Sequence, residues 1–107
     1  MRTGRLNRRV TIQRLEVTKD EYNADIESWA DVTTVWAHIE PLRGREYWQA
    51  KQVVGEVAGR ITIRYLAGID EKMRVTYGDR IYNILAVINL EERNRTLQLL
   101  VKEILND

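Results

Sequence analysis

The sequence predicts a mainly β protein, a small antiparallel β-barrel of about six strands with one short α-helix. Along most of the chain apolar residues alternate with polar ones, which is the pattern of strands with one buried face. Only residues 45–54 combine helical spacing of apolar residues with a start and a stop signal. In addition, Gly78 and Asp79 separate two alternating runs, as expected for a two-residue hairpin loop.

The composition indicates a single domain over residues 1–107. A chain of 107 residues with 44% hydrophobic content can bury one small core. It has no cysteine, which excludes disulfides, thiolate catalysis and cysteine-based metal sites. No apolar run approaches the roughly 20 residues of a membrane span, and the start of the chain lacks the apolar core of a signal peptide, so we expect a cytoplasmic protein.

Residues 1–9 are basic and form either a solvated arm or a docking arm for an acidic partner. Residues 9–17 are the first predicted strand. Within it the apolar positions change face between Ile12 and Leu15, which predicts a bulge or a strong bend near Gln13–Arg14.

Residues 18–25 are polar and acidic, and we expect them to form an exposed loop or the tip of a long hairpin. A calcium-binding loop would need oxygen ligands at alternate positions and a central glycine. Tyr22 and Ala24 occupy two of those positions and the segment contains no glycine, so the sequence predicts no metal site here.

Residues 26–39 predict two strand pieces with a kink at Ala30–Asp31. In the second piece Ala37 and its apolar neighbours two positions away face inward, while Trp36 and His38 face outward. His38 is the only histidine, so a metal site or a histidine-dependent catalytic triad would lack partners.

The predicted helix covers residues 45–54, with Gly44 as its N-cap and Gly55 as a left-handed stop. Further strands are predicted at residues 60–65, 73–77, 80–88 and 96–104. In the first of these the inward residues are Ile61, Ile63 and Tyr65, and the outward ones are Arg60, Thr62 and Arg64.

Two of these strands carry apolar groups on a second face. Residues 81–88 are apolar on both faces, and Leu100 points away from the inward residues of the last strand. Both surfaces need cover, either from the helix or from a neighbouring subunit. Closing the sheet into a barrel removes its exposed edges.

No catalytic arrangement is recognisable. The sequence has no glycine-rich phosphate loop, no nucleophile elbow and no histidine–carboxylate set. Acidic pairs such as Asp20–Glu21 lie in turn-like segments, where adjacent side chains point apart. We therefore expect neither an enzyme nor a cofactor.

Five segments together resemble the bacteriophage head–tail joining proteins, also called head-closure, stopper or head–tail adaptor proteins. They are GRLNRRVTIQR at 4–14, VWAHIEPLRGREYWQA at 35–50, RITIRY at 60–65, RIYNILAVIN at 80–89 and ERNRTLQLL at 92–100. The resemblance covers nearly the whole chain in the right order, and it is the ordered set that is specific.

The resemblance implies a non-enzymatic β-barrel subunit without a cofactor. Copies would assemble into a ring, dodecameric when complete, between the portal or adaptor complex and the tail-completion protein. Packaged DNA would pass through the channel without sequence-specific binding, and in some relatives a loop closes that channel. Such a protein would occupy the host cytoplasm during assembly and then the connector of the virion, without a membrane or a small-molecule substrate.

A ring subunit needs two different complementary faces. Surplus apolar residues could supply them, and the candidates for interface contacts are Trp36, Tyr47, Trp48 and Leu100. We expect Tyr47 and Trp48 at the edge of the helix to contact the adaptor or a neighbouring copy. The alternative is that these residues pack under the helix within one chain.

The acidic segment 18–27 suits the lining of a DNA channel, because like charge prevents DNA from adhering to it. The candidate residues for a channel loop are Asp20, Glu21 and Asp25. Residues 41–59 are the rival candidate, since glycines flank the helix within this long crossover.

The alternative function is a small-barrel nucleic-acid-binding module. Such a module needs a basic groove with aromatic stacking platforms. The residues available for it are Arg60, Arg64, Arg74 and Arg80 with Tyr65, Tyr77 and Tyr82. A net charge of only +1 argues against a dedicated duplex-DNA binder.

Overall fold

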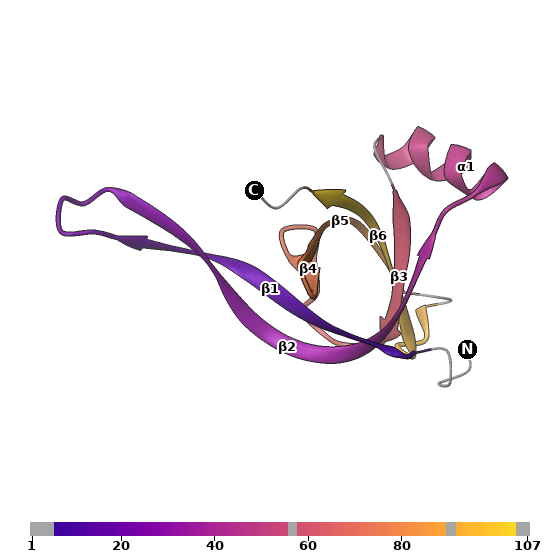
Figure 1. Ribbon diagram of the computed structural model, residues 1–107, viewed down its shortest axis with the longest axis horizontal. Helices are drawn as coiled ribbons and strands as arrows, with labels where there is room; N and C mark the ends of the chain where they lie inside the picture. The colour runs from indigo at the N-terminus through magenta and orange to yellow at the C-terminus, as the bar shows by residue number, and fades with distance from the viewer. Residues whose placement is uncertain (1–5, 56–57, 90–91, 105–107) are drawn as a thin grey trace.

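The computed structural model describes residues 6–55, 58–89 and 92–104, so positions 1–5 of the predicted basic arm lie outside the described residues. The elements are β1 (Arg8–Lys19), β2 (Asp25–Pro41), α1 (Gly44–Val54), β3 (Gly59–Arg64), β4 (Arg74–Tyr77), β5 (Arg80–Asn89) and β6 (Thr96–Ile104). The strands close into an antiparallel barrel in the order β1-β2-β3-β6-β5-β4, with α1 at one end (Figure 1). This confirms the predicted fold class.

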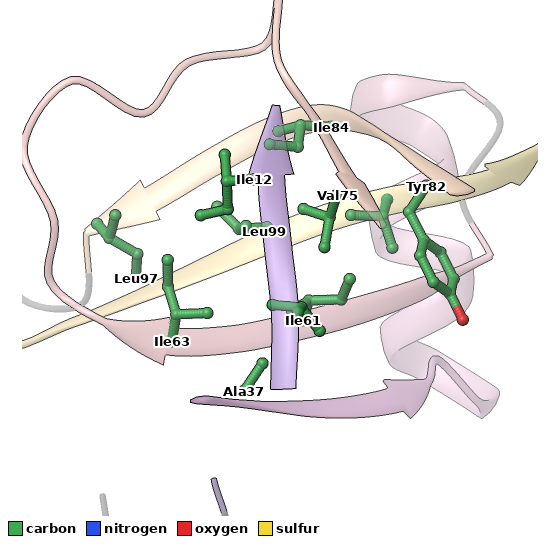
Figure 2. Close-up of a cluster of buried hydrophobic side chains, with 11 residues drawn as sticks. Ile12, Ala37, Ile61, Ile63, Val75, Tyr82, Ile84, Leu97 and Leu99 are labelled. Atoms are coloured by element: carbon green, nitrogen blue, oxygen red, sulfur yellow. The ribbon is translucent and has the colours of Figure 1, made fainter. Parts of the chain in front are cut away.

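The barrel interior is filled by alternate residues of all six strands (Figure 2). The buried cluster consists of Val10, Ile12, Ala37, Ile61, Ile63, Val75, Tyr82, Ile84, Leu97, Leu99 and Val101. Val35 and Ile39 pack against it, which confirms the predicted inward face around Ala37. The prediction for Tyr65 was wrong, because β3 ends at Arg64 and the Tyr65 side chain is exposed.

Two register shifts bend the sheet. Ile12 pairs with Thr33 but Gln13 pairs with Asp31, so Val32 is an extra residue in β2. The predicted bulge is therefore confirmed at this point, with the extra residue on the partner strand. The predicted kink at Ala30–Asp31 does not divide the strand, because β2 runs without a break for 17 residues.

The second shift lies between β5 and β6, where Leu85 is the extra residue between Ile84 and Ala86. The apolar residues on the two faces of β5 pack against two different clusters. Ile84 belongs to the barrel core, whereas Leu85 and Ala86 pack against a second apolar cluster.

Helix α1 covers this second cluster, which is built on buried Leu42 and Leu100. The N-cap is Arg43, in extended conformation and without a side-chain cap, so the helix starts one residue earlier than predicted. The helix stops at Gly55 as predicted, and the Gly55 N–H donates to the Lys51 carbonyl at 2.9 Å, but with φ +82° and ψ −102° this residue is not in the predicted left-handed helical conformation.

Beyond the first bulge, β1 and β2 continue as a long hairpin that projects from the barrel (Figure 1). We call its paired residues 13–19 and 25–31 the hairpin shaft, and residues 20–24 the tip. The molecule measures 49 Å along one axis and 27 Å along the other two. The hairpin accounts for this elongation, because the barrel itself is compact (Figure 1).

Candidate functional site

The outer surface of the barrel carries a shallow groove around Trp36, which we call the Trp36 groove. It is lined by Leu6, Asn7, Arg9, Thr34, Val35, Trp36 and Arg64. The Trp36 side chain is 50% exposed, and the Arg9 guanidinium lies 5.0 Å from its ring centroid. The groove therefore combines apolar side chains with two guanidinium groups, those of Arg9 and Arg64. The exposure of Trp36 confirms its predicted outward orientation.

The helix presents a second aromatic surface. Tyr47 is half-buried against the cluster beneath α1, and its ring meets that of Trp48 edge-on with centroids 5.3 Å apart. Trp48 itself is 61% exposed. The Lys51 ammonium lies 5.3 Å from the Trp48 centroid and 5.9 Å from the Tyr47 centroid, within the range of a cation–π contact with both rings.

Leu100 is in a different position from the other interface candidates. It is only 9% exposed and packs under α1 against Leu42, Tyr47 and Ala50. This is the alternative that the sequence left open, in which the helix of the same chain supplies the cover. Leu100 therefore offers no free surface to a partner.

The three acidic channel candidates lie at the end of the hairpin but differ in their surroundings. The Asp20 carboxylate accepts hydrogen bonds from the backbone N–H groups of Tyr22 at 2.8 Å and Ala24 at 2.9 Å. It therefore holds the turn together. Asp25 pairs with Lys19 across the strands. Glu21 is exposed and has no ion-pair partner within the described part of the chain.

One face of the hairpin shaft is apolar although it lies in solvent. Leu15 pairs with Trp29 and Val17 pairs with Glu27, so these four side chains share a face. The three apolar members are exposed, Val17 by 55%. The sequence shows that Leu15 and Val17 share a face, but nothing in it identifies this face as a site.

The base of the hairpin is fixed to the barrel by a polar network. Arg74 in β4 donates to the Gln13 side chain at 2.8 Å, and Gln13 donates to Asp31 at 2.8 Å. The same guanidinium lies 4.1 Å from the Trp29 ring centroid, and its burial lowers the pKa of Arg74. These contacts set the direction in which the hairpin leaves the barrel.

Two of the four arginines proposed for nucleic-acid binding, Arg60 and Arg80, are paired with carboxylates. Arg60 pairs with Glu40 at 2.8 Å and with Glu46 at 3.3 Å. Arg80 binds the Glu103 carboxylate through two nitrogens at 3.0 and 2.7 Å, which lowers the pKa of Glu103 and raises that of Arg80.

Of the three aromatic platforms proposed for that alternative, Tyr82 is not available, whereas Tyr65 is exposed. Tyr82 is buried at one end of the core, and its hydroxyl has no hydrogen-bond partner among the described residues. Burial raises the pKa of this hydroxyl. Burial of Tyr82 and the ion pairs of Arg60 and Arg80 therefore argue against a basic groove that uses all of these residues.

Within residues 6–55, 58–89 and 92–104, no cluster of acidic or histidine side chains is suited to holding a metal ion. His38 is half-buried, not freely exposed, and its Nε2 lies 3.6 Å from Glu40. No helix of this part of the chain has the length and apolarity of a membrane span.

Residues 1–104 match the profile of a family described as phage head completion protein. A curated relative, the head completion protein gp16 of Bacillus phage SPP1, is 35% identical over 57 residues. The match spans 53% of this chain and 52% of that relative, so the chain covers only about half the length of the relative.

Two solved structures share the fold. The solution structure of protein SF1141 from Shigella flexneri 2a is 28% identical, with a TM-score of 0.82 over 100% of both chains. A chain of the virion of a native gene transfer agent particle is 21% identical, with a TM-score of 0.62 over 95% of this chain and 98% of that one. The second similarity concerns the fold alone.

Proposed function

The chain belongs to the phage head completion protein family, and we propose that it joins head to tail as one subunit of a ring between the portal complex and the tail. The observation that carries this proposal is the family match over residues 1–104 on a barrel that leaves aromatic surfaces uncovered. Its partners would be an adaptor or portal protein on one side and a tail-completion protein on the other.

Ring formation is supported by the asymmetry of the exposed surfaces. The Trp36 groove and the Trp48 surface differ in composition, and each differs from the apolar face of the hairpin. A closed ring uses two different faces of each subunit in a head-to-tail contact. We propose a dodecamer, assembled in the host cytoplasm and retained in the virion connector, with no catalytic or cofactor-dependent step.

We assign the Tyr47–Trp48 surface to contact with the adaptor or a neighbouring copy. Tyr47 packs in the cluster beneath α1 and contacts Trp48 edge-on, so the Trp48 side chain is partly ordered before binding and loses less conformational entropy on contact with a partner. Trp48→Ala is expected to reduce the fraction of heads that acquire tails, and normal joining would remove this assignment. Lys72→Ala, on an exposed residue outside this surface, is the matched control.

We further propose that the hairpin tip faces the DNA path, because Glu21 adds negative charge there. Asp25 is paired with the Lys19 ammonium, whereas Asp20 accepts hydrogen bonds only from neutral backbone N–H groups and keeps its negative charge beside Glu21. The segment 41–59, which contains α1, is the competing channel element. Cryo-electron density of the assembled connector would show whether the hairpin tip or the segment 41–59 faces the channel. Density that places both segments on the outer rim would contradict a gating role for each of them.

The joining role itself is tested by deleting the gene from the phage or prophage that encodes it. We expect DNA-filled heads and free tails to accumulate, and a plasmid copy of the wild-type gene to restore complete particles. Complete particles formed in equal number without the gene would contradict the proposed function.

A further inference from the structure

Two surfaces of this chain have no assigned partner and complement each other. One is the apolar face of the hairpin shaft, formed by Leu15, Val17 and Trp29, with Glu27 between them. The other is the Trp36 groove. An exposed apolar face on a strand pair is costly in solvent unless another surface covers it.

The charges of the two surfaces are opposite. Residues 13–33 contain six acidic and two basic residues. Glu27 in the shaft has no ion-pair partner among the described residues, and neither have Arg9 and Arg64 in the groove. Contact would bring an unpaired carboxylate to two unpaired guanidiniums while Trp36 and the shaft cover each other.

The two surfaces of one molecule cannot meet each other. The hairpin tip and the start of β1, which borders the groove, lie at opposite ends of the long axis (Figure 1). The network of Arg74, Gln13 and Asp31 holds the base of the hairpin in this direction. A partner must therefore supply the second surface.

The length of the hairpin suits a second copy of the chain. Seven residues of extended strand, 13–19, span about 20 Å. The two shorter axes of the molecule are 27 Å, so a shaft laid on a neighbouring barrel crosses most of its width. Because donor and acceptor surfaces are at opposite ends, every copy could both give a hairpin and receive one.

We infer that the hairpin shaft of one copy docks in the Trp36 groove of the next copy, with Glu27 facing Arg9 and Arg64. This head-to-tail contact rests on the proposed function, in which copies form a ring, and it specifies the surfaces that build the ring. The tip remains outside the contact.

The absence of cysteine from the sequence means that this chain contributes no background to a cysteine cross-linking test. Full-length protein with Asn7→Cys and Val17→Cys, one exposed position at the groove and one on the apolar face, is incorporated into particles and treated with a short bismaleimide. We expect a ladder of covalent oligomers of this chain extending beyond the dimer, because each copy links to two neighbours.

The matched control combines Asn7→Cys with Thr18→Cys. Thr18 is adjacent to Val17 but points to the opposite face of the hairpin, so the ladder should be at least several-fold weaker. Tailed particles that show no ladder with the Val17 variant would overturn the inference and leave the joining role intact. A cross-link to a different virion protein, or dimers alone, would overturn it as well.

A charge exchange covers the case in which the cysteine variants fail to assemble. Glu27→Arg and Arg64→Glu should each lower the yield of joined particles several-fold, because each places like charges at the contact. The double variant should return the yield to within about twofold of wild type. Absence of such rescue, with each purified variant folded by circular dichroism, would overturn the inference.

Discussion

The barrel and the hairpin are built from the same kind of antiparallel pairing but differ in where their apolar side chains go. In the barrel, residues such as Ile12, Ile61 and Leu99 are completely buried. In the hairpin, Leu15 and Val17 alternate just as regularly yet remain exposed. Alternation therefore identifies which side chains share a face, but not whether that face is covered within the chain.

This difference indicates separate roles for the two regions. The barrel gains its stability from burial inside one molecule. The hairpin shaft is stabilised by cross-strand pairs, the turn around Asp20 and the network at its base, none of which requires its apolar face to be covered. We therefore expect substitutions in the barrel to affect folding and those on the hairpin face to affect assembly.

The largest expected effect is from Leu99→Ala in the barrel core. Removing this fully buried side chain leaves a cavity between packed strands, so the free energy of unfolding should fall by about 2–5 kcal/mol. Val17→Ala on the hairpin should change it by less than about 1 kcal/mol, because that side chain is exposed. Urea denaturation measures both, and equal losses would contradict the separation of roles.

Leu100→Ala tests the second apolar cluster. Because Leu100 is covered by α1 of the same chain, its truncation should lower the free energy of unfolding by about 2 kcal/mol even in the isolated protein. Trp48→Ala, on the outer side of the helix, should change it by less than about 0.5 kcal/mol. Loss of head joining in the Leu100 variant with unchanged stability would instead favour an interface role for Leu100.

Arg74→Ala tests how the hairpin is held. Its loss removes the hydrogen bond to Gln13 and the contact with the Trp29 ring, which should lower the free energy of unfolding by about 1 kcal/mol. Backbone amides of residues 13–19 should exchange faster with deuterium, while those of β6 should not. Arg64→Ala is the control, and equal exchange in both variants would show that the network does not order the hairpin.

The sequence predicted the barrel because burial on one face imposes a period of two residues. The last strand, residues 96–104, was predicted with the bounds that the structure has. The prediction that Tyr65 faces inward was wrong. Pairing of β3 with β6 ends at Arg64, and the Tyr65 N–H donates to the Arg95 carbonyl at 3.0 Å. Such a long-range contact leaves no local signal.

The candidate surfaces were predictable only in part. Trp36 was placed on the outward face correctly, and Leu100 was recognised as needing cover, because both follow from strand phase. The network at the hairpin base could not be predicted, since Arg74 and Gln13 are 61 residues apart in the chain. The tip of a long hairpin was one of two predictions for residues 18–25, but the exposure of Leu15 and Val17 was not predictable, because their alternation is the same as that of buried strand residues.

The smallest expected effect concerns the ion pair of Arg80 and Glu103 on the barrel. The hydrogen bonds from Arg80 hold the pKa of Glu103 below its ordinary value of 4.5, so the pair stabilises the folded state above that pH. This contribution should disappear as the pH falls from above 4.5 through the lowered pKa. Glu103→Gln should therefore lose less stability than wild type over that acid range, measured by thermal unfolding.

A double-mutant cycle separates this pair from other acid-sensitive groups. Arg80→Gln removes the donors, so it should flatten the same part of the pH profile as Glu103→Gln does, and the double variant should add nothing further. Both side chains are largely exposed, which keeps the effect small and sensitive to salt. If the effects of Arg80→Gln and Glu103→Gln were additive, the loss of stability in acid would not arise from this ion pair. A variant of the Lys19–Asp25 pair would then show whether the hairpin contributes to that loss.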